Sequence, residues 1–221
     1  MYRMILPETL PDVLAVENDA GAGADARAFE ADAAASRTRA DYGRVSRWLW
    51  GLLGTAGAAI AIVLVSGAVN MATAGGDAFT AAASAGILIL AALVPGTPSA
   101  WLLVSLHRSG RRLARAAAYW AALPYRRRTH APTKGDWFAV RFLAYSADLF
   151  PRVTTSALAG LATIFAASLA VRALVVGEPA WELTLWLGWA LLFGTVCVGQ
   201  FGGVQRIQNG YVARGPQLRK H

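Results

Sequence analysis

The sequence predicts an all-α integral membrane protein with four transmembrane helices arranged as two hairpins, both termini in the cytoplasm and further amphipathic helices on the cytoplasmic side. Two observations lead to this fold class. Of the 221 residues, 56% are hydrophobic and only 15% are charged, whereas about a quarter of the residues in a soluble domain are charged. Four long stretches also contain almost no charged residue. Each is about long enough to span a membrane, because a helix needs about 20 apolar residues to cross a bilayer.

The apolar stretches define the four expected spans. They lie near 48–69, 82–106, 153–176 and 182–204. The first span, WLWGLLGTAGAAIAIVLVSGAV, is apolar or small on every face, whereas a helix of a soluble protein keeps a polar stripe. The third span contains Arg172, whose long stem can carry the guanidinium to the headgroups from the outer end of the helix.

The basic residues predict the orientation. The loop 107–152 carries ten Lys and Arg residues, whereas the connections 70–81 and 177–181 each carry one charged residue, which is acidic. Lys and Arg accumulate on the cytoplasmic side of a membrane. Both termini and the long loop are therefore expected in the cytoplasm. The Ala, Gly and Arg bias is typical of a bacterial protein, which would place this chain in the inner membrane.

The spans divide the chain into six segments. These are a loosely ordered tail (1–24), a cytoplasmic helix (25–47), a first hairpin (48–106), a basic loop with interfacial helices (107–152), a second hairpin (153–204) and a basic tail (205–221). The second segment is rich in Ala and Arg, which favour helices. Its apolar side chains are alanines, Phe29 and Tyr42, so we expect a helix that is solvated or bound to a partner.

The basic loop provides the candidate contacts with lipid or with a partner. Its first arginines are expected to extend the second span as a helix that ends near Pro124, and a second cluster follows that proline. Trp137 begins an amphipathic interfacial segment. The candidate contact residues are Arg111, Arg112, Arg115, Arg126, Arg127, Arg128 and Trp137. Anionic headgroups and an acidic partner protein both fit this charge. Nucleic acid is not expected, because the loop contains no recognised binding module and membrane topology accounts for its charge.

The spans offer three further features. Pro95, Gly96 and Pro98 in the second span predict a kink or a break, because proline removes a helical hydrogen bond. A kink that neighbouring groups tolerate is favoured over a break that binds a ligand. Gln200 and Arg172 are the candidate polar residues inside the spans, where burial in hydrocarbon is costly.

The sequence contains no pattern for catalysis, metal binding or a cofactor. The three histidines lie outside the expected spans, and the single cysteine, Cys197, cannot form an intramolecular disulfide. We therefore expect a small non-catalytic membrane subunit, or an accessory or scaffold protein, that binds another membrane protein or a second copy of itself. The alternative is a small oligomeric channel or transporter that uses a broken second span.

Overall fold

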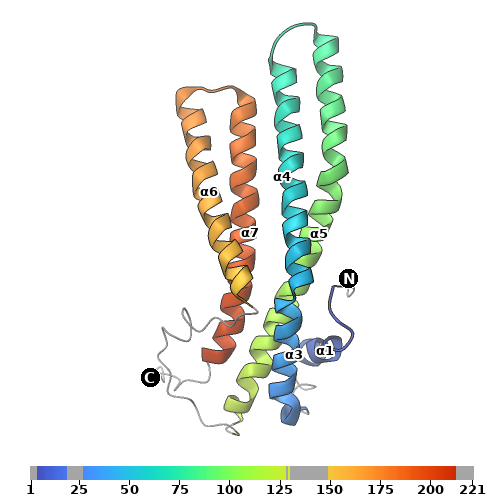
Figure 1. The fold of residues 1–221 in the computed structure, drawn as a ribbon, viewed down its shortest axis with the longest axis vertical. Coiled ribbons are helices and arrows are strands. Elements are labelled where there is room, and N and C mark those ends of the chain that lie inside the picture. Colours follow the sequence, from blue (N-terminus) through green and yellow to red (C-terminus); the bar gives the residue numbers. More distant parts are fainter. Residues whose placement is uncertain (1–3, 19–26, 128, 130–148, 213–221) are drawn as a thin grey trace. The chain divides into compact units, whose positions relative to one another are not determined.

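The computed structural model describes residues 4–18, 27–127, 129 and 149–212, and these residues contain helices and no strand (Figure 1). The elements are α1 (Leu10–Glu17), a 3-10 turn η2 (Ala28–Glu30), α3 (Ala31–Gly43), α4 (Val45–Thr73), α5 (Ala78–Arg126), α6 (Phe150–Val176) and α7 (Ala180–Val212). Four helices, α4 to α7, are long and apolar enough to cross a membrane. The prediction of an all-helical chain with four such helices is confirmed.

The contacts divide the chain into two compact units. Unit 1 comprises Met1–Trp48, Ser105–Val153 and Gln200–His221, and unit 2 comprises Leu49–Val104 and Thr154–Gly199. Unit 2 holds the apolar parts of α4 to α7, which are taken here as the membrane-spanning segments. Unit 1 holds α1, η2, α3 and the more polar ends of the long helices.

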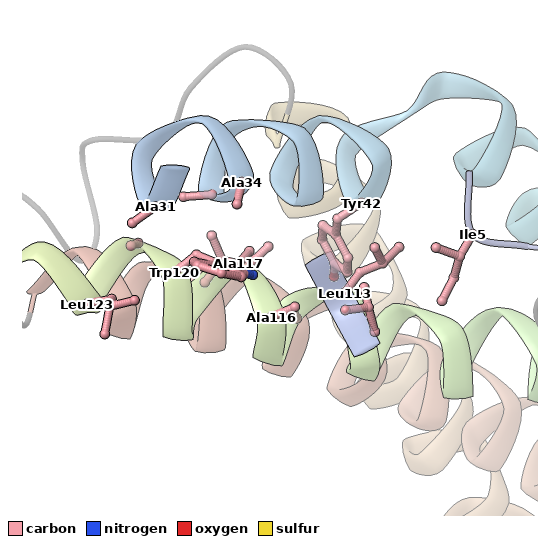
Figure 2. Close-up of a cluster of buried hydrophobic side chains, with 14 of the residues drawn as sticks. Ile5, Ala31, Ala34, Tyr42, Leu113, Ala116, Ala117, Trp120 and Leu123 are labelled. Atoms are coloured by element: carbon pink, nitrogen blue, oxygen red, sulfur yellow. The ribbon is translucent and has the colours of Figure 1, made fainter. Parts of the chain in front are cut away.

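The core of unit 1 forms between α3 and the second half of α5. Figure 2 shows Ala34 and Tyr42 of α3 facing Leu113, Ala117 and Trp120 of α5. Trp120 is fully buried and is the largest side chain in this core. Buried residues recur along this part of α5 every three or four positions, which is the spacing of one helix face. The expected helix around 25–47 thus exists as η2 and α3, and its alanine face packs against its own chain.

The N-terminal segment belongs to this core. Residues 1–24 were expected to be loosely ordered, but residues 4–18 are packed, and Ile5 and Val13 are buried in the core of unit 1. The apolar residues of α1 explain this, because they recur at helical spacing and complete the surface offered by α5.

Unit 2 packs through small residues. A Cβ built on Gly54 of α4 would lie 3.1 Å from Leu103 of α5, and one built on Gly188 of α7 would lie 2.7 Å from Ile62 of α4. Ser156 of α6 donates a hydrogen bond of 3.1 Å to the Cys197 carbonyl of α7. Helices in lipid associate through such close contacts, because apolar burial gives no driving force there.

The second span is not broken. α5 runs without interruption through Pro95, Gly96 and Pro98. The structure therefore lacks the break that the channel or transporter alternative required, and the kink that was favoured at these residues stays a prediction. The Pro95 carbonyl lies 3.4 Å from the position that a Cβ on Gly57 would occupy. Proline is tolerated in membrane helices where neighbouring groups compensate for the lost hydrogen bond. α5 also continues two residues beyond Pro124, to Arg126.

Candidate interaction surface

Polar contacts within unit 1 fasten the N-terminal segment to the end of α3 and to the start of α4. The Asp41 carboxylate accepts a hydrogen bond of 2.9 Å from the Leu6 amide and one of 2.8 Å from the Thr9 hydroxyl. The Arg47 guanidinium donates to the Met4 carbonyl. Hydrogen bonds to charged groups are about twice as strong as neutral ones, so these three contacts hold residues 4–9 in place.

The buried Asp12 fastens α1 to α3 through its carboxylate and to α5 through its main-chain carbonyl. Asp12 is 1% exposed, and its oxygens accept hydrogen bonds of 2.9 and 3.2 Å from Nε and a terminal nitrogen of Arg37. Arg27 lies 3.1 Å from the same carboxylate. The Trp120 indole donates a hydrogen bond of 3.0 Å to the Asp12 carbonyl. One residue of α1 therefore joins three other parts of unit 1.

Two arginines are enclosed where α4 and α6 begin. Arg47 is 3% exposed and donates a hydrogen bond of 2.9 Å to the Ser109 hydroxyl. Burial lowers the pKa of Arg47 to about 10, so it stays charged at neutral pH. The Arg152 guanidinium stacks 4.4 Å from the centre of the Tyr42 ring, and burial raises the pKa of that phenol against the opposing charges of Arg152 and Arg47. These side chains serve the packing of unit 1, since they are turned inward.

The side of α5 that lies opposite the buried Leu113 and Trp120 carries three exposed arginines. They are Arg108, Arg111 and Arg115, and we call them the arginine face. They follow one another at spacings of three and four residues, which places them on one side of the helix. None of them forms an ion pair or hydrogen bond with the part of the chain that the structure describes. α5 itself contains no Asp or Glu.

Arg112 lies at the edge of this face and is already engaged. Its Nε donates a hydrogen bond of 2.6 Å to Glu17 of α1, and one of its terminal nitrogens donates to the second oxygen of the same carboxylate. Such a two-point contact is the preferred way in which arginine binds a carboxylate or a phosphate. Arg112 was predicted to contact lipid or a partner together with Arg111 and Arg115. It differs from these two because its guanidinium already binds Glu17.

The remaining predicted residues lie apart from the arginine face. Arg126 covers the ring of Tyr119 at 4.2 Å, and Arg127 is exposed at the end of α5. Arg128 and Trp137 lie outside the described residues. In unit 2, Arg172 forms an ion pair of 3.2 Å with Glu178, and Gln200 is a half-buried residue of α7 in unit 1.

Sequence reasoning missed Arg108 as a member of the arginine face. Its spacing from Arg111 and Arg115 was a visible signal, but only the helix and its buried opposite side show that the three share one exposed surface. It also missed Asp12, Asp41 and Arg47, whose partners lie far away in the chain.

No family model matches the chain, and neither the curated proteins nor the solved structures include a significant match.

Proposed function

We propose that this chain is a non-catalytic integral membrane protein that binds another membrane protein or complex as an accessory or scaffold subunit. The proposal places its four spans as two hairpins in the inner membrane of a bacterium, with unit 1 in the cytoplasm. The basic residues concentrated in unit 1 support this orientation under the positive-inside rule.

The observation that carries the proposal is unit 1 itself. Three separate segments of the chain combine into a module with its own apolar core, a buried Asp12 and a basic exterior. Connecting four spans requires no such module, because short turns of a few residues are enough between helices. A rigid module outside the spans is suited to contact with a partner.

Phe29 marks a place for that contact. It lies in η2 of unit 1, and 84% of its surface is exposed. Large exposed aromatic side chains commonly anchor protein interfaces. The neighbouring Arg27 and Glu30 pair with each other, and the Arg27 guanidinium also lies 3.1 Å from Asp12. These ion pairs hold the turn that carries Phe29.

The spans give less support to a channel or transporter. That alternative depended on a break at Pro95, and α5 is continuous there. In the described residues of unit 2, Arg172 and Glu178 form an ion pair with each other. Of the other carboxylates in this unit, Asp77 precedes α5 and Glu182 lies in the first turn of α7, so both are at helix ends.

The test is site-specific crosslinking in native membranes, followed by reconstitution. A photoreactive amino acid replaces Phe29, and the matched control carries it at Ala40, which is exposed in α3 of the same unit. We expect a foreign membrane protein to crosslink in stoichiometric amount from position 29 and not from position 40. The two purified proteins should then form a complex that Phe29→Ser weakens.

Other results would contradict the proposal. If only copies of this chain crosslink, and if the purified oligomer makes liposomes permeable to ions, the accessory function is wrong and the channel function replaces it. A complex with the foreign protein that Phe29→Ser leaves unchanged would reject Phe29 as the contact.

A further inference from the structure

We propose that the arginine face, Arg108, Arg111 and Arg115, is a binding site for the phosphate groups of anionic membrane lipids. The proposal is independent of the protein partner argued above. It assigns to these three residues the lipid contact that sequence reasoning had spread over the whole basic loop.

The register of α5 supplies the first argument. Successive residues of an α-helix turn by about 100°, so Trp101, Val104 and the three arginines share one side of this helix. Trp101 is 67% exposed and Val104 is 49% exposed. Following this side along α5, exposed apolar residues give way to a tryptophan and then to arginines. Side chains that face lipid change in this order from the acyl chains to the headgroups.

The length of the site fits a headgroup layer. Arg108 and Arg115 are seven residues apart, which corresponds to about 10 Å along the helix axis. The polar layer on each side of a bilayer is about 5 to 8 Å thick, and an arginine side chain extends several ångströms beyond its backbone. Three guanidinium groups can therefore reach the phosphates of one leaflet together.

The other side of α5 keeps the arginines in this position. Leu113, Ala117 and Trp120 are buried in the core of unit 1, so the helix cannot rotate to hide its charges. Arg112, on the border between the two sides, is held by Glu17. Three like charges on two turns repel each other, and an anionic ligand would remove this repulsion.

A lipid fits this surface better than an acidic protein does. Protein interfaces usually combine charges with buried aromatic or aliphatic anchors. From His107 to Arg115, the exposed residues are that histidine and the three arginines alone. Phosphate binding needs only the guanidinium groups, which match a phosphate with two parallel hydrogen bonds.

The experiment uses the full chain purified in a neutral detergent. Short-chain phosphatidylglycerol is titrated against it, with short-chain phosphatidylcholine and inorganic phosphate as comparison ligands. The test variant is Arg108→Gln/Arg111→Gln. The matched control is Arg126→Gln/Arg127→Gln, which removes the same charge from the last residue of α5 and the residue after it. Thermal unfolding verifies that each variant is folded.

We expect phosphatidylglycerol to bind more tightly than either comparison ligand. Its affinity should fall about 30-fold in the test variant, since each arginine at an anionic surface contributes about 1 kcal/mol. The control variant should change the affinity less than threefold. Arg108→Lys/Arg111→Lys should restore part of the loss, because the charge returns without the two-point hydrogen bonds.

Three results would overturn the proposal. Equal losses in the test and control variants would show that net charge, and not the arginine face, attracts the lipid. Equal affinity for inorganic phosphate would show a site for free anions. If the test variant keeps its lipid affinity but loses a crosslinked protein partner, the face binds an acidic protein instead.

Discussion

The two units of this molecule differ in the residues that they bury. Unit 1 encloses large and charged side chains in addition to alanines, among them Trp120, Leu113, Asp12 and Arg47. In the described part of unit 2, every buried residue is Gly, Ala or Ser: Gly54, Ser66, Ala68, Ala92, Ser99, Ser156, Ala159, Ala166, Ala170 and Ala173. The large apolar side chains of unit 2, such as Leu161, are exposed.

This difference shows that each unit is built for a different solvent. In water, burial of large apolar side chains drives folding, and buried charges must be paired or hydrogen-bonded. In lipid, large apolar side chains are as well solvated outside as inside, so the helices gain most by bringing small residues together. The chain thus changes its packing rule within single helices, and α5 follows both rules along its length.

The largest expected effect separates the two cores directly. Trp120→Ala should destabilise unit 1 by about 3 to 5 kcal/mol, because it leaves a cavity and removes the hydrogen bond to Asp12. Leu161→Ala, which removes an exposed side chain of unit 2, should cost less than about 1 kcal/mol. Hydrogen–deuterium exchange of α3 and α5 measures the loss for each variant. Similar losses for both variants would show that lipid-exposed side chains also stabilise the fold.

A smaller effect tests the buried charge of unit 1. Asp12→Ala should cost about 2 kcal/mol, less than for a fully buried pair because Arg37 and Arg27 remain partly exposed. Glu17→Gln, which weakens a more exposed ion pair with Arg112, should cost below about 1 kcal/mol. Thermal unfolding in detergent compares the two. If Glu17→Gln is the more harmful change, the fastening of α1 lies at Arg112 instead.

The small-residue packing of unit 2 has its own test. Gly188→Ala should destabilise the chain by about 1 to 2 kcal/mol, because the new Cβ would lie 2.7 Å from Cγ2 of Ile62. Gly86→Ala is the matched control, since it lies in α5 with no heavy atom within 4 Å of the added carbon. The control should be neutral or slightly stabilising, as alanine favours helices over glycine. Unfolding temperatures in detergent decide between them, and equal stability of both variants would show that α4 and α7 can separate freely.

The smallest expected effect lies outside both cores, at the turn before α5. The Thr80 hydroxyl and amide donate hydrogen bonds of 2.8 and 2.9 Å to Asp77 and lower the pKa of that carboxyl. Its stabilising effect is therefore present above the pH at which a free aspartate ionises, and it is lost as the pH falls through the lowered value. The unfolding temperature of Asp77→Asn should be slightly below that of the original chain at neutral pH and equal to it in strong acid. A difference that persists in acid would show that the charge is not involved.

The sequence was most informative where composition alone decides the structure. The four apolar helices could be predicted because charge-free runs of this length have few other uses. The continuation of α5 beyond its span was also visible in its helix-forming residues. By contrast, the packing of residues 4–18 depends on Asp12 and Asp41 meeting groups far along the chain. Pairings of this kind leave no local pattern.

Two features of the structure differ from what local sequence patterns suggest, for definite physical reasons. Residues 4–18 belong to a tail that was expected to be loosely ordered, but they are packed, and Asp12 is buried there beside Arg27 and Arg37. The break that the channel alternative required at Pro95 is absent, because local rules describe an isolated helix, and α5 packs closely against Gly57 of α4 at that point. The arginine face could be recognised only from the sequence and the structure together. Its spacing was in the sequence, but its exposure required the buried side of α5 to be known.

The three-segment construction of unit 1 also sets the order in which the molecule can be completed. The fully buried Val204 and Ile207 belong to α7, the last described helix, whereas Ile5 and Val13 of the same core lie about two hundred residues earlier in the chain. During translation the N-terminal segment therefore waits, with its apolar residues uncovered, until about two hundred residues have been synthesised. The core of unit 1 can therefore close only after the ribosome has synthesised the end of α7. Chains that stop before α7 is complete leave Ile5 and Val13 in a core without Val204 and Ile207.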